Sequence, residues 1–572
     1  NSCSNYYVVI PSFITDKPEP EDYWNISYYI PALKTNKERV CKKCYDTICA
    51  KTIAYEQIQA IFKNPIPIDQ MKRQVINPQV SNHYCEHLRN IQYYLPNHTY
   101  TTIDKGLLMA NSHHFAGHSK YTVSLIKSID WQSDNQIMLI SSILNGNKTM
   151  QCNDLMCTRT CQEQLSFDDS LNILFSTHKN LPDSIIKYLF SIINQTPDDI
   201  IRCHVAALTE ICSNSCRDII HSLFYQTISG SLTLMYHTFW FMIYDRNNET
   251  SANVDKFLSL YDKSLLATLH NEYNFFVQLI DNLDSPQQYL SSRLVKPITL
   301  PDDPEWVIIK ADNNNICIKD SYTKPVLIPF VIQKDDETKT IKLLFKRDGV
   351  MTDVMVLNLM TLMDILLKEN IDENFDVVVY PTLPLSKNAG MIEIVDNAVT
   401  VHDIMIKEQS ILQHILSRNE DKVVSRVLDR YMYGMASYTL HSYFLGLGDR
   451  HLQNIMIQDD GMIFHIDFGY ILGTDAYPLT STDIKLCAGM LDVIGGTDST
   501  RRQRYLKLCT KGIIVLRKYF NLFYILLAKT NPTRKLDTYI INKFQPRQTD
   551  KIVTNELLTI ISHSNNAYSE YI

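Results

Sequence analysis

The hydrophobic period of this chain changes abruptly near residues 291–306, and that change restricts the fold more than any other feature. Upstream of it, apolar residues recur at i, i+3, i+4 and i+7 in runs such as "SIIKYLFSIINQ" and "DDIIRCHVAALTEICSN", a spacing typical of amphipathic helices. Downstream of the linker "SSRLVKPITLPDDPEW", short alternating runs predict strands. The sequence therefore predicts a multidomain chain in which an all-α part precedes a part that contains a sheet.

The helical part is expected to cover residues 116–290, where tight links between successive helices predict stacked antiparallel pairs. One stretch, Leu223 to Tyr244, carries no Asp, Glu, Lys or Arg. It is nevertheless crowded with Gln, Ser, Thr and His, which find no hydrogen-bond partners in a hydrocarbon interior. We therefore expect a buried helix here, within a scaffold that carries no visible chemistry.

The part after the linker divides into two lobes of different kinds. The runs "EWVIIKA", "NICIKD", "PVLIPFVIQ", "IKLLFKRD", "DVVVYP" and "GMIEIVDN" predict strands, and "MVLNLMTLMDILLKEN" predicts one long helix among them. Residues 291–400 are thus expected to form a small α+β lobe, and the helical runs of residues 401–572 a second lobe. A cleft between two unlike lobes is a default ligand site.

Residues 1–115 show no clear period, so the sequence leaves their fold open. Within them, Cys41 and Cys44 in "CKKC" would supply half of a zinc site, with His83 or Cys85 as further ligands. The second pair is irregularly spaced, so ordinary thiols are the favoured interpretation and zinc stays the alternative.

Charge and cysteine content limit the partners and the compartment. The net charge of -7 gives no overall attraction to nucleic acid. Fourteen cysteines in a long chain that starts without a signal-peptide pattern indicate reduced thiols in the cytoplasm. We therefore expect a cytoplasmic protein whose anionic partners are met locally.

The stretch "LGLGDRHLQNIMIQDDGMIFHIDFG", residues 445–469, concentrates the polar chemistry. Two short apolar runs around Asp-Asp-Gly predict a β-hairpin. A turn of two or four residues would set Asn454 opposite His465 or Asp467 and place both candidate ligands on one face, whereas a three-residue turn would direct one away. A neutral and an anionic oxygen ligand on a shared face suit Mg²⁺, and Asp449 on the preceding loop would lie near the attacking group.

These residues make up the parts of a phosphoryl-transfer site: a metal clamp, a proton acceptor and a lysine for the nucleotide phosphates. Protein kinases carry His-Arg-Asp, then four residues, then Asn, with Asp-Phe-Gly further on. Here the order is inverted to Asp-Arg-His at residues 449–451, yet Asn454 keeps the same step from the acid and Asp-Phe-Gly follows at residues 467–469. The pattern therefore predicts a kinase.

"GDRHLQNIMI" together with "FHIDFGYILG" resembles the phosphatidylinositol 3-/4-kinase superfamily, in which inverted Asp-Arg-His is the hallmark. The resemblance spans residues 120–572 and extends to "YHTFWFMIY", "SYTKP", "LNLMTLMDILLKEN" and "GMIEIVDN". "DFGYILG" and "GMLDVIGG" are most similar to class III phosphatidylinositol 3-kinase catalytic subunits. The resemblance implies a helical accessory (PIK) domain before a bilobal, protein-kinase-like domain, and offers a C2-like remnant as one alternative for residues 1–115.

The resemblance also implies the nucleotide contacts. Lys346 in "LLFKRD" corresponds to the lysine that contacts the ATP phosphates, and Asp353 and Tyr380 to a polar pair behind the nucleotide. Ser321 in "DSYTKP" falls in the loop that covers the phosphates, where Lys324 would assist. A plain turn is the alternative for this loop.

Hinge and metal residues follow from the same resemblance. Glu393 and Val395 correspond to the hinge whose backbone groups hold adenine. Asn454 and Asp467 correspond to the ligands of Mg²⁺, or of Mn²⁺ in its place.

Asp449, Arg450 and His451 correspond to the catalytic motif. Whether Asp449 or His451 takes the proton of the lipid hydroxyl is left open. A histidine titrates nearer neutral pH, which favours His451 with Asp449 orienting it.

The chain departs from the family pattern in two places. The family's Gly-Asp-Asp-Leu-Arg-Gln-Asp after the lysine is replaced by a shorter stretch, "KRDGVMTD", which lacks the Arg-Gln pair. The basic, aromatic helix that usually ends class III enzymes and helps to hold the membrane is absent from "SHSNNAYSEYI". Both departures motivate an alternative function, a catalytically weak scaffold.

The segment after Asp-Phe-Gly, residues 470–486, is called the activation segment below, and its charge bears on the substrate. It contains one basic residue, Lys485, beside Asp475 and Asp483. A loop that binds polyphosphorylated inositol needs several Lys or Arg. This segment therefore suits a head group that carries only the bridging phosphate.

The sequence thus predicts an ATP- and Mg²⁺-dependent phosphatidylinositol 3-kinase that produces phosphatidylinositol 3-phosphate. By resemblance it would act peripherally on endosomal or other intracellular membranes, in membrane trafficking and autophagy, with regulatory kinase-like and coiled-coil subunits and without nucleic acid. The alternatives are a phosphatidylinositol 4-kinase, a related protein serine/threonine kinase and the weak scaffold.

Overall fold

A computed structural model describes residues 6–10, 36–40, 86–112, 118–146, 164–319, 323–407, 410–476, 484–496, 499–530 and 536–564. The chain forms two compact units, one of residues 1–94 with 98–166 and one of residues 95–97 with 167–572. The predicted residues that lie outside the described ranges are Cys41, Cys44, His83, Cys85, Ser321 and Asp483.

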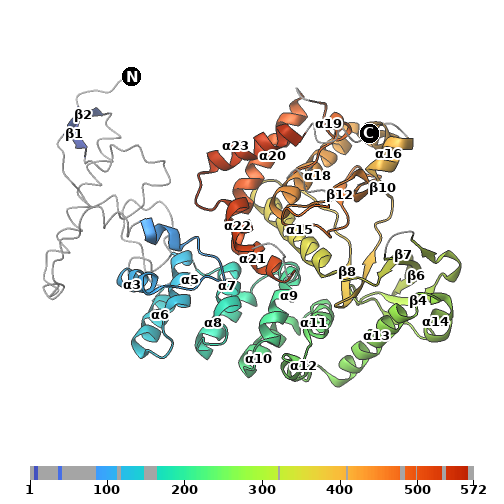
Figure 1. The fold of residues 1–572 in the computed structure, drawn as a ribbon, viewed down its shortest axis with the longest axis horizontal. Helices are drawn as coiled ribbons and strands as arrows, with labels where there is room; N and C mark the ends of the chain where they lie inside the picture. The colour runs from blue at the N-terminus through green and yellow to red at the C-terminus, as the bar shows by residue number, and fades with distance from the viewer. Residues whose placement is uncertain are drawn as a thin grey trace. The chain divides into compact units, whose positions relative to one another are not determined.

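The first unit contains a short antiparallel strand pair and several helices (Figure 1). One of these helices, α3, begins with a capping box in which the side chains of Thr101 and Asp104 accept hydrogen bonds from each other's backbone amides, which satisfies amides that have no partner inside the helix. The elements are β1 (Tyr6–Ile10), β2 (Asn36–Val40), α3 (Thr102–Ala110), α5 (Ser119–Ser128) and α6 (Asp134–Gly146).

The second unit begins with a run of short helices joined by tight links, as the sequence predicts (Figure 1). Two of them follow a proline and carry aspartate in the first turn, where a negative charge interacts favourably with the helix dipole. This helical run comprises α7 (Phe167–Thr177), α8 (Asp183–Ile193), α9 (Asp198–Ser213), α10 (Asp218–Ile228), α11 (Leu232–Asp245), α12 (Ser251–Leu258), α13 (Lys263–Asp281) and α14 (Pro286–Arg293).

The uncharged stretch from Leu223 to Tyr244 forms two helices, so the expected single helix is wrong in that respect. α10 ends before Gly230 and α11 starts after it. Glycine interrupts the helix because ordering its backbone costs the most entropy. α11 is buried along most of its length, as expected. Among the described helices, none combines the length and the apolar character that crossing a membrane requires.

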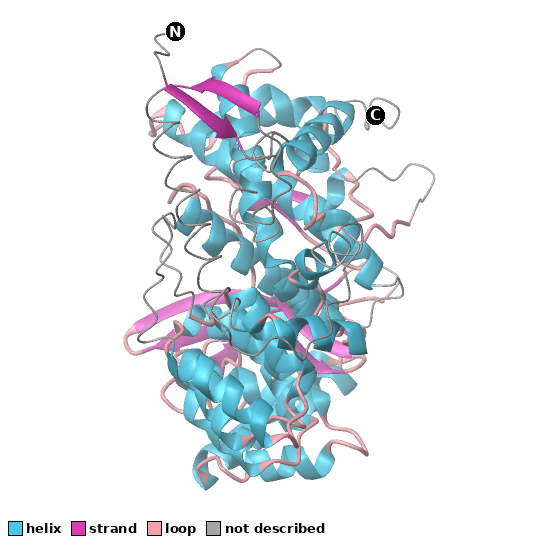
Figure 2. Cartoon of the chain, turned by 90° about the vertical axis from the view of Figure 1, so that its left-hand side faces the viewer, coloured by secondary structure: helices cyan, strands magenta, loops and turns pink. Residues whose placement is uncertain are grey.

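The small lobe is built on an antiparallel sheet in the strand order β3-β4-β6-β7-β9-β8, with β5 also paired to β6. Figure 2 shows the strands in magenta and the helices in cyan. The strands are β3 (Ile298–Thr299), β4 (Val307–Ala311), β5 (Cys317–Ile318), β6 (Val326–Lys334), β7 (Glu337–Lys346), β8 (Thr382–Ser386) and β9 (Ala389–Glu393).

One predicted strand of this lobe, "DVVVYP", is wrong. Residues 376–381 form an irregular, half-buried connection, and β8 starts directly after them. The apolar composition of these residues correctly indicated that they are partly buried. A strand, however, also requires a neighbouring strand with which to pair. β8 itself contains Pro384, which is tolerated because β8 lies at the edge of the sheet and its pairing with β9 is irregular at that point.

The long helix α15 (Met351–Asn370) joins the parts of the second unit. Buried residues occupy most of its positions, as expected for a helix that is covered on several sides. It packs against β8 of the sheet, α9 of the helical run, and α18, α20 and α21 of the large lobe. Its first turn carries Asp353, so this packing also sets the position of that side chain.

The large lobe is mainly helical and includes a small three-stranded sheet. β10 pairs with β11, and β11 pairs with β12, so the segment after the hinge is tied to the predicted hairpin. The predicted fold class, a helical part followed by a bilobal α+β part, is confirmed. The elements are β10 (Ala398–Thr400), α16 (Val401–Lys407), α17 (Ile411–Ser417), α18 (Val424–Leu445), β11 (Ile455–Gln458), β12 (Ile463–His465), α19 (Ala488–Val493), α20 (Thr500–Leu516), α21 (Phe520–Ala528), α22 (Leu536–Phe544) and α23 (Asp550–Ser564).

Candidate active site

Two glycines shape the loop that follows α18. Gly446 ends the helix with φ +55°, a left-handed conformation that glycine adopts without strain. A Cβ atom on Gly448 would lie 2.0 Å from the carbonyl oxygen of Thr474, so only glycine fits there. The activation segment therefore runs alongside this loop, and the amides of Gly448 and Gly473 donate to the carbonyls of Tyr470 and Gly446 at 2.9 Å each.

Arg450 holds the loop and the hairpin together. Its side chain is almost fully buried. Nε donates to the carbonyl of Gly448 at 2.7 Å, and Nη1 donates to the carbonyls of Ile466 at 2.7 Å and Asn454 at 3.3 Å. Nη2 donates to the carbonyl of Asp467. A planar guanidinium with five donors suits this arrangement, and it makes Arg450 a positioning residue rather than a group that touches substrate.

The hairpin turn contains three residues, between Gln458 and Met462, so the two-residue and four-residue alternatives are wrong. Asn454 consequently lies opposite Ile466, whose amide donates to the Asn454 carbonyl at 3.1 Å. Strict strand alternation would then separate the side chains of Asn454 and Asp467. Asn454 instead ends a 3₁₀ turn and Asp467 has φ +60°, so both leave the regular alternation. The buried arginine binds the backbone carbonyls of both residues.

Asp449 and His451 lie side by side on the accessible side of the loop. Asp449 Oδ2 is 3.9 Å from His451 Nε2, and the side chains are 25% and 50% exposed respectively. Asp449 has φ +52°, a conformation that costs a residue with a side chain some free energy and is often found at functional sites. Either side chain can accept a proton, so the geometry does not decide whether Asp449 or His451 is the proton acceptor.

Asn454 and Asp467 fit a Mg²⁺ ion chemically. The Asn454 Nδ2 atom donates to the carbonyl of Asp449 at 2.9 Å, which leaves Oδ1 as an acceptor. One Asp467 carboxylate oxygen accepts from the Gly469 amide at 3.3 Å, which leaves the other oxygen. Two hard oxygen ligands with space for phosphate oxygens suit Mg²⁺. Clusters of three or more His, Cys, Asp or Glu that could hold a metal do not occur in the part of the chain that the structure describes.

Behind the hairpin, Asp353 accepts a hydrogen bond from the Phe468 amide at 3.3 Å. Burial, opposed by the Lys346 ammonium and reinforced by the Asp467 carboxylate, raises the pKa of Asp353 to about 6. Tyr380 is buried as well, and its burial together with the carboxylate of Asp353 raises the pKa of its phenol well above the ordinary value. These residues therefore form one electrostatic cluster behind the predicted metal ligand.

The altered stretch after Lys346 is anchored to the helical run. Arg347 donates to both carboxylate oxygens of Asp284, at 2.9 and 3.2 Å, and to the carbonyl of Ile280 at 3.3 Å. These contacts hold the end of β7, where Lys346 is the last residue. Asp353 reaches the Asp-Phe-Gly backbone although the stretch is shorter than in the family pattern.

The predicted hinge connects β9 to β10. The Glu393 amide donates to the Pro381 carbonyl at 2.8 Å, and the Ile394 amide to the Lys342 carbonyl at 2.9 Å. Within the described residues, no acceptor is bonded to the Val395 amide. The hinge therefore offers a backbone donor, as a site for a heterocyclic base requires.

In the predicted phosphate-covering loop, the structure describes Lys324 but not Ser321. Lys324 is exposed and has φ +44°. A residue with left-handed backbone conformation, such as Lys324, is typical of a turn. The described part of this loop is therefore a turn that exposes the Lys324 ammonium.

Lys485, the single basic residue of the activation segment, is held by the protein. Its Nζ atom lies 3.4 Å from Asp475 Oδ2, and the two side chains are 15% and 1% exposed. The Tyr438 hydroxyl donates to the Lys485 carbonyl at 2.9 Å, and the Tyr438 ring stacks on His465 with centroids 4.0 Å apart. The charge of Lys485 is thus neutralised internally rather than presented to a substrate.

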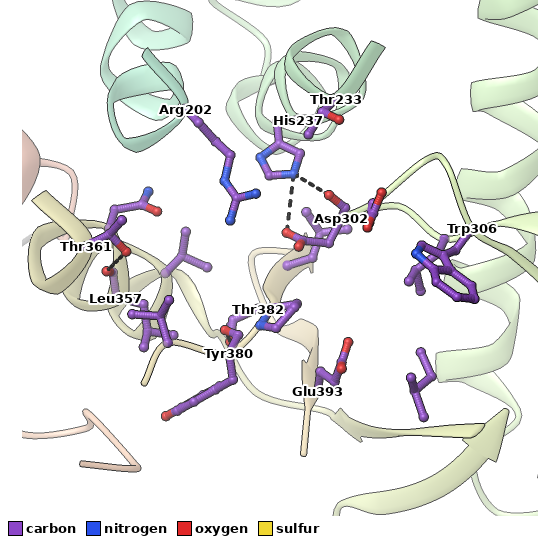
Figure 3. A pocket seen from close by; sticks show the side chains of 18 of the residues that line it. Arg202, Thr233, His237, Asp302, Trp306, Leu357, Thr361, Tyr380, Thr382 and Glu393 are labelled. Atoms are coloured by element: carbon purple, nitrogen blue, oxygen red, sulfur yellow. Dashed lines mark hydrogen bonds and ion pairs between the residues drawn. The ribbon is translucent and has the colours of Figure 1, made fainter. Parts of the chain in front are cut away.

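The structure also contains a cavity that no local motif signals. It has a volume of about 550 Å³ and lies between the helical run and the small lobe. Figure 3 shows the Glu393 side chain pointing into it and the Tyr380 ring pointing away. Its lining residues are spread from Arg202 to Glu393, so sequence spacing does not bring them together. Four of them lie in the linker "PDDPEW", but that linker alone does not indicate a cavity.

Comparison with known proteins finds similarity to one kinase family in part of the two lobes. Residues 340–536 match the family model of phosphatidylinositol 3- and 4-kinase. The phosphatidylinositol 3-kinase nodule isoform of Glycine max is 30% identical over 266 residues, which are 45% of this chain and 31% of that protein. The phosphatidylinositol 3-kinase VPS34 of Candida glabrata is 30% identical over 321 residues, 53% of this chain and 35% of that protein.

The VPS34 protein of Saccharomyces cerevisiae is 26% identical over 289 residues, 48% of this chain and 32% of that protein. The chain therefore spans about a third of the length of these relatives. The resemblance seen in the sequence motifs is confirmed, and the matched segment contains the predicted nucleotide and metal residues from Lys346 to Asp467.

Proposed function

We propose, on the premise that residues 340–536 form a phosphatidylinositol 3- and 4-kinase domain, that the chain is an ATP-dependent phosphatidylinositol 3-kinase. It would transfer the γ-phosphoryl group of ATP to the 3-hydroxyl of phosphatidylinositol. The observation that carries this proposal is that Arg450 donates hydrogen bonds to the carbonyls of Asn454 and Asp467. These bonds tie the Asp449–His451 loop to the segment that carries the candidate metal ligands.

In this proposal each residue has a defined task. The ammonium of Lys346 meets the ATP phosphates, and the Val395 amide meets adenine. Asn454 Oδ1 and Asp467 would hold Mg²⁺, whose charge would stabilise the transferred phosphoryl group when it is bound. His451 takes the proton of the lipid hydroxyl as its oxygen bonds to the γ-phosphorus and the bond to the ADP oxygen breaks.

The choice of phosphatidylinositol as the lipid rests on the activation segment. Lys485 is engaged by Asp475, so the segment lacks the several unpaired cations that a polyphosphorylated head group requires. A substrate with only the bridging phosphate matches this charge. Peripheral action on endosomal or other intracellular membranes, a part in trafficking and autophagy, and regulatory kinase-like and coiled-coil subunits belong to the same proposal.

The test is a vesicle assay that resolves positional isomers of the product. The purified chain, phosphatidylinositol vesicles and Mg·ATP should yield phosphatidylinositol 3-phosphate, and Asp467→Ala should lower turnover by about 10³-fold. A 4-phosphate as the only product would replace the 3-kinase assignment with a 4-kinase. Turnover equal to that of Asp467→Ala would instead indicate the catalytically weak scaffold.

A further inference from the structure

The cavity between the helical run and the small lobe has the size of a small-molecule site. Its volume of about 550 Å³ falls within the range of about 300–1,000 Å³ that is usual for ligand pockets. Its walls come from α9 and α11 on one side, from the linker before β4, and from β6 to β9 with α15 on the other side. Asp449, Asn454 and Asp467 do not line it.

One end of the cavity is positively charged. Figure 3 shows the guanidinium of Arg202 pointing inward from α9. Asp302 lies between this end and Glu393 and interacts electrostatically with both. It is also engaged by His237, whose Nε2 atom lies 3.0 Å from the Asp302 carbonyl and 3.3 Å from its carboxylate. Although burial raises it, the hydrogen bond and charge of His237 and the charge of Arg202 together lower the pKa of Asp302, yet no carboxylate of the described residues forms an ion pair with Arg202. Its planar donors are therefore available to a carboxylate of a ligand.

The opposite end is negatively charged. The Glu393 carboxylate points into the cavity from the end of β9, across from Arg202 (Figure 3). Burial, together with the nearby carboxylate of Asp302, raises the pKa of Glu393 to about 7. The Asp303 carboxylate also lines the cavity. A half-buried carboxylate that is disfavoured by burial and by neighbouring acids is stabilised by a cation placed next to it.

The walls between the two ends are mainly apolar and hydroxylic, and Trp306 contributes an aromatic surface over which Lys339 Nζ lies 4.2 Å from the ring centroid. These walls suit a methylene chain more than a further charge. The wall residues include Thr233, Leu300, Ile341, Leu357, Thr382 and Leu383.

We propose that this cavity binds a small extended zwitterion, whose carboxylate pairs with Arg202 and whose ammonium pairs with Glu393. A simple anion would leave the Glu393 carboxylate with only the charge of Lys339 to oppose its own, and a simple cation would leave Arg202 with only the charge of Asp302. A ligand that carries both charges, separated by several methylene groups, satisfies both ends and covers the apolar walls. The site would contact the back of the hinge, because the Glu393 amide bonds the Pro381 carbonyl and both residues line the cavity.

The test is a binding titration on the whole chain in the absence of nucleotide, so it is independent of lipid kinase turnover. The probe is ε-aminocaproate, and caproate and hexylamine, each with one charge, are the matched ligands. The variants are Arg202→Gln and Glu393→Gln. Arg293→Gln serves as the control, since Arg293 is an exposed arginine that does not line the cavity.

The expected result is that ε-aminocaproate binds the wild-type chain at least about tenfold more tightly than either single-charge ligand. Each cavity variant should weaken this binding about tenfold or more, and Arg293→Gln should leave it unchanged. Three outcomes would each overturn the proposal: equal binding of caproate and ε-aminocaproate, binding that survives both cavity substitutions, or no detectable binding of any ligand. Circular dichroism of the variants separates loss of binding from loss of folding.

Discussion

The cavity and the loop that carries Asp449 and His451 are assembled in opposite ways. The loop belongs to one continuous stretch, residues 445–475, in which a single buried guanidinium binds the carbonyls around it. The cavity draws charged side chains from distant parts of the chain, among them Arg202, Asp302 and Glu393. We therefore expect loop substitutions to reduce stability and activity together, whereas substitution of Arg202 in the cavity should change ligand binding alone.

Arg450→Met should have the largest effect on stability. It removes the donor of several buried carbonyls at once, and we expect the free energy of unfolding to fall by about 3 kcal/mol or more. Urea denaturation measures this change. Arg450→Lys is the matched control, since it retains the charge but not the planar set of donors. Its unfolding free energy should lie between those of the wild type and Arg450→Met. A loss of under about 0.5 kcal/mol in Arg450→Met would contradict the role assigned to this residue.

Gly448→Ala should have the next largest effect. The added Cβ would lie 2.0 Å from the Thr474 carbonyl oxygen, a backbone atom that cannot move without shifting the activation segment. We expect a loss of about 1–3 kcal/mol in unfolding free energy. The matched control is Gly230→Ala, where a Cβ meets nothing within 4 Å, and which should leave stability unchanged or slightly raised. Equal effects at both positions would show that the close packing of the loop is unimportant.

Asp353→Asn tests the electrostatic cluster behind the loop through its pH dependence. The pKa of Asp353 is raised from 3.8 to about 6, so the folded chain binds this proton more tightly than the unfolded chain. Wild-type stability should therefore fall as the pH rises through this interval, and the variant should not show that fall. Above pH ~6 the variant should be more stable by up to about 3 kcal/mol.

Below pH ~4 this advantage of Asp353→Asn should vanish, because the carboxyl group is then protonated in both states. Denaturation curves at several pH values measure the difference. If the difference in unfolding free energy between the variant and the wild type is the same at all pH values, titration of the Asp353 carboxyl group is not its cause. Kinase activity should fall in the variant, since the carboxylate bonds the Phe468 amide beside Asp467.

Arg202→Gln should have the smallest effect on stability. Arg202 is exposed and lines the cavity without an ion pair among the described residues. The unfolding free energy should therefore stay within about 0.5 kcal/mol of the wild-type value. A loss above about 1.5 kcal/mol would show that Arg202 supports the packing of the helical run, and would remove the contrast with Arg450.

Much of the fold could be predicted because local patterns carry it. The period change marked the passage from helices to sheet, and the run around Leu357 correctly indicated α15. The predictions failed where pairing decided the outcome. Residues 376–381 are apolar enough for a strand but lack a neighbouring strand, and Gly230 divides a stretch that composition presents as one helix.

The candidate site divides in the same way. The inverted Asp-Arg-His motif, its step to Asn454 and the following Asp-Phe-Gly are local, and comparison with known proteins confirmed the family they indicated. The reason given for bringing Asn454 and Asp467 together was a hairpin face, and the three-residue turn removes that reason. In the structure, Asp467 has a left-handed backbone conformation and Arg450 donates to its carbonyl. Neither feature can be derived from strand alternation.

The amino-acid sequence by itself determined the order of helical and sheet-containing parts and the resemblance to a kinase family, and it supplied the candidate reactive side chains, because each depends on residues close together in the chain. Tertiary structure alone decided that Arg450 is a buried positioning residue, that Lys485 is neutralised by Asp475, and that Arg202 and Glu393 face one cavity. The physical reason is that burial and pairing depend on which distant segments pack together. The charge of a side chain is local, whereas the groups that neutralise it, or leave it available to a ligand, are set by the fold.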